Sequence, residues 1–324
     1  MELNDRRILV TGALGQIGSE LVPALRARVS PDRVVASDIR MPRPDSPLGE
    51  GLFEHVDCTE LRQIQDVVRR HDIGAIYHLA GVLSAVGEDW PHVAWDVNLG
   101  GLYRILEVAR QNRCALFFPS SIGAFGPTTP RERTPQDTLQ RPQTIYGITK
   151  VTGELLCDYY ARRFGVDTRG LRLPGIISYV APPGEGTTDY AVEIFHHAIR
   201  YRRRYTCFLR ADTRLDMMYM PDTLRAIIAL MEADPARLHH RNAFNITAMS
   251  ITPAELAQAI RRHVPELVID YRIDPVRQAI ADSWPRSLDD SAARAQWGWA
   301  PAYDLEAMTA DMIERLAERL GNER

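Results

Sequence analysis

The sequence contains very little lysine and few cysteines. Lysine and arginine together number 39 among 324 residues, and Lys150 is the single lysine. The four cysteines are scattered without a Cys-x-x-Cys pair, which argues against the common zinc motifs and a disulfide framework and is typical of a reducing compartment. The nine histidines show no metal-ligand spacing either. We therefore expect no metal site.

Long apolar runs and a strong net charge are also missing. No apolar run approaches about 18 residues, so no membrane span is expected. The polar start Met1 to Asp5 leads directly into a predicted strand, so we expect no signal peptide and a cytoplasmic location. A net charge of −3 does not favour nucleic-acid binding, and the basic run Arg200 to Arg204 is interpreted as a solvated helix end.

The one lysine lies four residues after a tyrosine, in Tyr146-Gly147-Ile148-Thr149-Lys150. On a helix these two side chains share a face. An ammonium near a phenol favours the phenolate, which can act as a general base on an alcohol. Such a pair also arises by chance on amphipathic helices, so the remaining motifs decide its meaning.

A glycine-rich turn follows the first predicted strand, residues 7–10. It has the spacing Gly12-x-x-Gly15-x-x-Gly18 and leads into a predicted helix. Gly12 permits a tight turn, Gly15 lets the backbone approach a pyrophosphate, and Gly18 allows close helix–strand packing. The strand–turn–helix context indicates dinucleotide binding rather than a plain loop.

Strands and helices then alternate with short connections. The expected strands are 7–10, 33–37, 52–56, 74–79 and 114–119, and the expected helices are 61–70 and 92–111. Such alternation predicts an α/β fold with a Rossmann-type, doubly wound parallel sheet. A closing amphipathic helix is expected over 305–320.

The second strand ends at Asp38, twenty residues beyond Gly18. A carboxylate there can accept hydrogen bonds from both ribose hydroxyls and would repel a 2′-phosphate, which favours NAD over NADP. The neighbouring Arg40 weakens this inference, since a guanidinium could hold that phosphate.

Other candidates follow the later strands, at the edge where ligands bind in open α/β sheets. Asp57 and Cys58 could meet an adenine edge, and the small residues Ala80 and Gly81 suit close passage of a cofactor. Ser120 and Ser121 leave the fifth strand, where a hydroxyl could hold a substrate hydroxyl against Tyr146. A local turn or cap hydrogen bond is the alternative for either serine.

Together these motifs resemble the extended short-chain dehydrogenase/reductases. The matching residues are Thr11-Gly12-x-x-Gly15-x-x-Gly18, Asp38, Asp57, His78 to Gly81, Asn98, Ser120-Ser121, Tyr146-x-x-x-Lys150 and Leu171 to Gly175. Trp297 to Pro301 resembles the end of the UDP-galactose 4-epimerase-like branch.

Within that branch the sequence is most similar to the short-chain, zinc-independent L-threonine 3-dehydrogenases. The similarity rests on Gly12 to Gly18, Ser121 to Pro127, Pro174 to Ser178, Gly186 to Ala191 and Met217 to Met220. It implies further cofactor contacts at Gln16, Ile17, Ile39, Leu79, Asn98, Pro119, Pro174 and Ile176. It also implies a substrate site formed by Ser84, Ser121, Tyr146, Thr187, Thr188 and Trp284. The alternative for Ser84, Thr187 and Thr188 is a hydroxyl that stabilises a loop, and the alternative for Trp284 is a core tryptophan.

The resemblance implies NAD-dependent oxidation of L-threonine to 2-amino-3-oxobutanoate, with Tyr146 as base, Lys150 lowering its pKa and Ser121 positioning the oxygen. It implies a homodimer. The expected domains are a cofactor domain, residues 1–175 and about 213–248, and a substrate lobe, about 176–212 and 249–324. A nucleotide-sugar epimerase or dehydratase, with Arg214 or the 200–204 run clamping a diphosphate, is the first alternative. A non-catalytic NAD sensor is the second.

Overall fold

The computed structural model describes residues 6–44, 46–181, 184, 186–200 and 203–322. The N-terminal residues 1–5 and part of the basic run, Tyr201 and Arg202, lie outside these ranges. Within the described residues, no helix is both long and apolar enough to cross a membrane.

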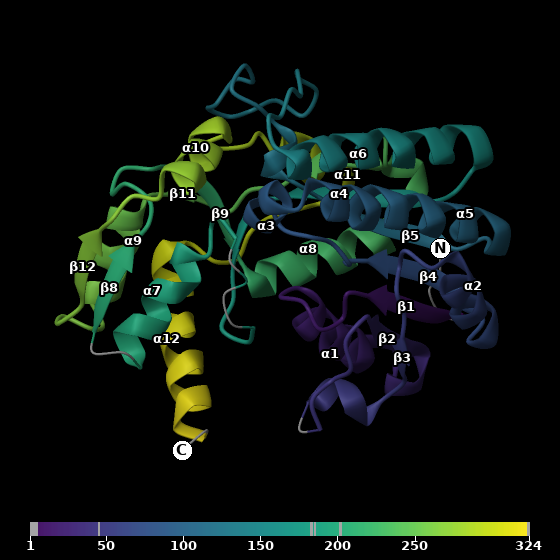
Figure 1. The fold of residues 1–324 in the computed structure, drawn as a ribbon, viewed down its shortest axis with the longest axis horizontal. Coiled ribbons are helices and arrows are strands. Elements are labelled where there is room, and N and C mark those ends of the chain that lie inside the picture. Colours follow the sequence, from purple (N-terminus) through teal and green to yellow (C-terminus); the bar gives the residue numbers. More distant parts are fainter. Residues whose placement is uncertain (1–5, 45, 182–183, 185, 201–202, 323–324) are drawn as a thin grey trace.

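A parallel sheet of seven strands forms the larger part of the molecule (Figure 1). Its order is β10-β6-β5-β4-β1-β2-β3, so the chain starts in the middle and winds outward in both directions. The strands are β1 (Arg7–Thr11), β2 (Val34–Asp38), β3 (Phe53–His55), β4 (Ile73–His78), β5 (Ala115–Ser121), β6 (Thr168–Leu173) and β10 (Phe244–Asn245). The predicted Rossmann-type sheet is confirmed.

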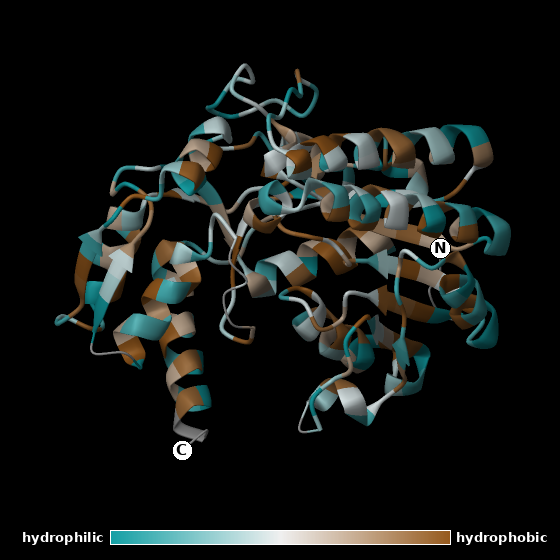
Figure 2. Ribbon diagram, in the orientation of Figure 1, coloured by the Kyte–Doolittle hydropathy of each residue, from teal (hydrophilic) through white to brown (hydrophobic). Residues whose placement is uncertain are grey.

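Helices cover both faces of this sheet because its strands are apolar on both sides (Figure 2). Leu9 points to the face that carries α2 (Leu61–Arg70), α5 (Leu102–Asn112) and α6 (Ile145–Phe164). Its neighbours Ile8 and Val10 point to the opposite face, with α1 (Gly18–Val29), α8 (Met220–Glu232) and α11 (Ser291–Trp297). Helix α2 has the predicted bounds.

Most of the remaining elements form a smaller lobe beside the carboxyl ends of the strands of the large sheet (Figure 1). It contains a three-stranded sheet in the order β11-β9-β7 and a two-stranded sheet of β12 and β8. The strands are β7 (Gly175–Ile177), β8 (Arg204–Cys207), β9 (Leu215–Tyr219), β11 (Met249–Ile251) and β12 (Val268–Tyr271). The helices are α7 (Tyr190–Ile199), α9 (Pro253–Arg261), α10 (Pro275–Ser283) and α12 (Leu305–Asn322).

The segments that cross between the lobes bear on the predicted domain boundaries. Helix α8 and strand β10, within 213–248, pack on the large sheet, whereas β9 in the same segment lies in the three-stranded sheet. Ala293 and Trp299, assigned to the substrate lobe, are buried against the core of the large sheet. The boundaries remain a prediction.

Two local predictions need correction. The continuous helix expected over 92–111 is divided into α4 (Pro91–Ala94), a π-helical segment η3 (Trp95–Gly101) and α5, preceded by a short α3 (Ser84–Asp89). Strand β5 continues through Ser120 and Ser121, which therefore do not leave the strand. The ladder with β6 extends that far, pairing Ser121 with Leu173.

Candidate active site

The glycine-rich turn forms a close-packed cradle at the start of α1. Gly12 has φ +69°, and a Cβ added there would lie 2.6 Å from the backbone nitrogen of Ala80. A Cβ at Gly18 would overlap the carbonyl oxygen of Gly12. Only glycine allows these approaches, and the N-terminus of α1 remains directed at the turn. These residues therefore fit the pyrophosphate of a dinucleotide.

The end of β2 carries the predicted ribose ligand. The Asp38 carboxylate accepts a hydrogen bond from the backbone nitrogen of Leu14 at 3.0 Å. Its other oxygen pairs with the backbone nitrogen and the guanidinium of Arg40, each at 3.1 Å. Ile39, between them, is exposed. Asp38 is thus fixed in place, and Arg40 partly neutralises its charge.

Asp57 and Cys58 have local partners. The Asp57 carboxylate accepts hydrogen bonds from the backbone and hydroxyl of Thr59 at 2.8 and 2.7 Å, which orders the turn before α2. Cys58 is buried against Gly101 of η3. Their predicted contact with adenine remains a prediction.

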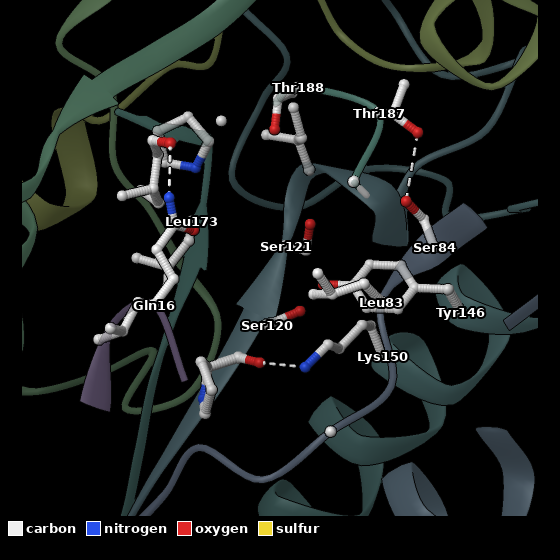
Figure 3. A pocket seen from close by; sticks show the side chains of 18 of the residues that line it. Gln16, Leu83, Ser84, Ser120, Ser121, Tyr146, Lys150, Leu173, Thr187 and Thr188 are labelled. Carbon is white, nitrogen blue, oxygen red and sulfur yellow. Dashed lines mark hydrogen bonds between the residues drawn. The ribbon is translucent and has the colours of Figure 1, made fainter. Parts of the chain in front are cut away.

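The catalytic candidates lie where the end of β5 meets the first turns of α6 (Figure 3). Thr144 caps α6 by accepting a hydrogen bond from the backbone nitrogen of Gly147, which fixes where the helix begins. Tyr146 and Lys150 therefore face the strand. Ser121 lies opposite Tyr146, and its hydroxyl accepts a hydrogen bond from the backbone nitrogen of Gly123 at 3.1 Å.

The Tyr146 ring packs closely over Gly123, because a Cβ at that glycine would lie 3.1 Å from two ring carbons. Burial raises the pKa of Tyr146 and its interaction with Ser121 lowers it. The lowering of the Tyr146 pKa by Lys150 stays a prediction. The Lys150 ammonium lies beside the ring, 5.3 Å from its centroid.

Lys150 is buried and donates a hydrogen bond to the Pro119 carbonyl at 2.7 Å, over the ring of Phe118. Burial lowers its pKa to about 8. His78, at the end of β4, is also buried and shares a hydrogen bond with the Thr11 hydroxyl at 2.8 Å. Burial and the nearby ammonium lower the pKa of His78 to about 3, so it is neutral.

Asn98 lies in the π-helical segment and joins two parts of the site. Its amide exchanges hydrogen bonds with the backbone of Val82, at 2.7 and 3.0 Å, and donates to the Thr149 hydroxyl at 3.4 Å. Asn98 thus holds the loop after β4 against the helix that carries Tyr146 and Lys150. The predicted cofactor contact of Asn98 stays a prediction.

A pocket of about 160 Å³ opens between the two lobes beside Tyr146. Ser84 of α3 and Thr187 of the smaller lobe meet across it, with their hydroxyl oxygens 3.2 Å apart (Figure 3). Trp284 lines the pocket and is also buried in the core of the smaller lobe, and its contact with substrate stays a prediction. Predicted residues that line this pocket are Gln16, Ile17, Leu79, Gly81, Ser84, Pro119, Ser121, Tyr146, Lys150, Pro174, Ile176, Thr187, Thr188 and Trp284.

Gln16 links the glycine-rich turn to the pocket wall, because its amide donates a hydrogen bond to the Ile176 carbonyl at 3.2 Å. This contact ties the glycine-rich turn to β7. Other predicted cofactor residues do not line the pocket. Gly12, Gly15 and Gly18 form the cradle, and Asp38, Ile39 and Arg40 lie at and just after the end of β2.

Comparison with known proteins agrees with this geometry. The model of the NAD-dependent epimerase/dehydratase family matches residues 8–247. The chain belongs to that family. It is 53% identical to L-threonine dehydrogenase from Clostridium difficile, with a TM-score of 0.94 over 97% of this chain and 98% of that one.

Two other relatives are similarly close. A GalE-like L-threonine dehydrogenase from Cupriavidus necator, solved in its holo form, is 49% identical over 96% of this chain and 99% of its own, with a TM-score of 0.92. An uncharacterised epimerase/dehydratase of Staphylococcus saprophyticus is 51% identical over 96% of this chain and 97% of its own. The resemblance to GalE-like threonine dehydrogenases is confirmed, and NAD is the cofactor of the family.

Reasoning from the sequence missed one residue that shapes the candidate site. Asp189 accepts hydrogen bonds from the backbone nitrogens of Gly184 and Gly186, at 2.6 and 2.8 Å, and so shapes the loop that carries Thr187. A lone aspartate after a glycine-rich run is a signal for such a turn. No group of three metal-ligating side chains occurs among the described residues.

Proposed function

We propose that this protein oxidises L-threonine to 2-amino-3-oxobutanoate with NAD, by a zinc-independent mechanism. The observation that carries the proposal is the alignment of Ser121, Tyr146 and Lys150 at the floor of a pocket whose far wall is formed by neutral hydroxyls. The high identity to proteins described as L-threonine dehydrogenases supports the choice of substrate.

Tyr146 is the general base in this proposal and takes the proton from the substrate hydroxyl. Ser121, whose oxygen lies at the end of β5 opposite the phenol, positions the substrate oxygen and stabilises charge on it. NAD, when bound, supplies the acceptor for the hydride from the β-carbon. Gly12, Gly18 and Asp38 would hold the cofactor.

Lys150 keeps a positive charge at the base of the site. Its ammonium donates to the Pro119 carbonyl, which fixes it below the Tyr146 ring. A cation there favours the tyrosinate during proton transfer. It also leaves ammonium hydrogens for the nicotinamide ribose.

The far wall suits a small polar substrate. Ser84, Thr187 and Thr188 offer neutral donors for a carboxylate, and Trp284 closes the apolar side. Lys150 is the one cation that lines this pocket among the described residues. A pocket of this kind is better matched to an amino acid than to a nucleotide diphosphate that is held by arginine or lysine side chains.

A nucleotide-sugar epimerase or dehydratase remains the second candidate, favoured by the family description. Three of the arginines that it would need have other partners. Arg214 binds Glu255 and the Ser250 carbonyl, each at 2.6 Å. Arg203 and Arg204 pair with Glu266 and Asp270. The sensor alternative is disfavoured by the assembled Ser121–Tyr146–Lys150 group.

We further propose that the protein is a homodimer. Exposed apolar side chains form one stripe on α6, at spacings of seven and four residues, and continue onto the adjacent η3 and α5. They are Ile148, Leu155, Tyr159, Trp95 and Tyr103. Pairing of this surface with its copy would form a four-helix bundle behind the catalytic helix.

The substrate is tested by NADH formation from NAD and L-threonine in the presence of a chelator. L-allo-Threonine, D-threonine and L-serine serve as controls. Stereospecific, chelator-resistant turnover supports the proposal. No NADH formation with L-threonine, together with conversion of a UDP-sugar, would contradict the proposal and favour an epimerase.

A further inference from the structure

Three consecutive residues of β5 contact three residues of α6 that lie one turn apart. The Pro119 carbonyl accepts from Lys150, the Ser120 hydroxyl donates to Glu154, and Ser121 lies opposite Tyr146. Positions 146, 150 and 154 share one face of the helix because they are spaced by four. Two of these three contacts hold residues of the proposed reaction, and the third holds Glu154.

Glu154 is itself held by a buried ion pair. Arg172 of β6 donates to both carboxylate oxygens, at 3.0 and 2.8 Å, and Gln140 donates to one of them at 2.8 Å. The side chains of Glu154 and Arg172 are only 6% and 7% exposed. Two buried charges cost desolvation free energy, so their geometry must be well satisfied to persist.

Arg172 is fixed on its other side as well. It donates to the Gln136 carbonyl at 2.7 Å and to the Asn245 side chain at 3.1 Å, and its guanidinium stacks over Phe125. The network therefore joins β5, β6, β10, α6 and the loop before α6. It lies directly beneath the site, and Ser120 is its one member that lines the pocket.

Glu154 also acts on the charge of the lysine: burial lowers the pKa of Lys150, and the Glu154 carboxylate one helical turn away opposes that shift. The titratable groups around Lys150 are Tyr146, Glu154 and Cys157 on α6 and His78 on β4. Burial lowers the pKa of His78 and raises the pKa of the Cys157 thiol and of Tyr146, so these three are neutral. Of the four, Glu154 is the one that enters a buried ion pair, and its carboxylate therefore lies between the Arg172 guanidinium and the Lys150 ammonium in charge balance.

We propose that Glu154 is a positioning residue for the proposed oxidation, holding Ser120 in the strand end that presents Ser121 and keeping Lys150 charged. This inference rests on the proposed function only for its kinetic effect. The coupling between Glu154 and Lys150 stands on the fold alone and can be measured without a substrate.

The single lysine makes that measurement direct. Selective isotope labelling of lysine gives one side-chain resonance in the NMR spectrum, which reports the titration of Lys150. Glu154→Gln keeps the size of the side chain and removes its charge. We expect the Lys150 midpoint to fall by about one pH unit, because an opposite charge one turn away is lost.

The kinetic arm uses the same variant. With L-threonine and NAD, kcat should fall about tenfold, and the alkaline limb of the pH profile should move down by the same shift as the NMR midpoint. Glu154→Asp should recover part of both effects. Ser120→Ala leaves the ion pair between Glu154 and Arg172 intact and should lower kcat severalfold. It provides the kinetic test if Glu154→Gln does not fold.

Asp167→Asn is the matched control. It weakens another ion pair, between the partly exposed Asp167 and the buried Arg169 at the opposite end of β6, at 2.8 Å. It should lower stability while leaving the Lys150 titration and the pH profile unchanged. The inference is overturned if Glu154→Gln or Ser120→Ala behaves like this control. If the wild-type protein does not oxidise threonine, the proposed function fails, and the NMR titration alone decides the coupling.

Discussion

At the scale of single residues, the account depends most on Tyr146. Replacing it with Phe keeps the ring over Gly123 and removes the proton acceptor. We expect kcat to fall by about 10³-fold or more while NAD still binds, since general-base catalysis contributes about 10²–10⁴. Steady-state kinetics and calorimetric titration with NAD check this. Tyr271→Phe, at an exposed tyrosine on β12 of the smaller lobe, should be neutral. Undiminished turnover by Tyr146→Phe would remove the assignment of the base.

A second residue-scale prediction concerns the choice of cofactor. Asp38→Ala removes the carboxylate that pairs with Arg40 and would repel a 2′-phosphate. The freed guanidinium could then face that phosphate, so the preference for NAD over NADP should weaken by about tenfold or more. The ratio of kcat/KM for the two cofactors measures it. An unchanged ratio would show that the preference is set by another group.

At the scale of elements, β9 contains a buried carboxylate with a consequence for stability. Burial raises the pKa of Asp216 to about 8. Its partners are the Thr247 hydroxyl at 2.7 Å and the Leu288 backbone nitrogen at 3.0 Å, which tie β9 to two later segments of the chain.

Because the folded pKa lies above the unfolded value of 3.8, the folded state binds the proton more tightly. This contribution to stability is complete below about pH 4 and is lost as the pH rises to about 8. Asp216→Asn can serve both partners without a charge. Its melting temperature should exceed that of the wild type by a few degrees near pH 8, and the difference should shrink towards pH 4. A constant difference across this range would contradict the argument.

Elements differ in how well the sequence predicts them. The strands were predictable because runs such as Ile8 to Val10 are apolar throughout, and the glycine spacing located the cofactor turn. The π-helical segment was not, because no local pattern separates it from a regular helix. The pair Glu154–Arg172 was not predictable either, since its members lie on different elements and meet only when β5, β6 and α6 assemble.

The candidate site also has features that the sequence predicts and features that it does not. The motif residues that line the pocket could be proposed from their spacing and from family resemblance. Asp38 illustrates what spacing omits: its position was predicted, but its pairing with Arg40 depends on side-chain geometry. The raised pKa of Tyr146 depends on burial, which short motifs do not encode.

For the whole molecule, the exposed stripe on α6 predicts an assembly of two chains. Light scattering should give twice the 36.6 kDa chain mass. Leu155→Arg places a charge in the stripe and should yield monomers. Val276→Arg, at an equally exposed apolar residue on α10, is the control and should remain dimeric. A wild-type protein that is monomeric at micromolar concentration would contradict the dimer.

The central claim is net oxidation of threonine at its β-carbon, and isotope transfer tests it most directly. L-Threonine deuterated at that carbon is incubated with the protein and NAD, and the reduced cofactor is analysed by mass spectrometry. We predict that the released NADH carries the deuterium and that Tyr146→Phe abolishes its formation. Turnover that releases unlabelled NADH would contradict the claim, as would a protein that inverts a sugar carbon without releasing any reduced cofactor.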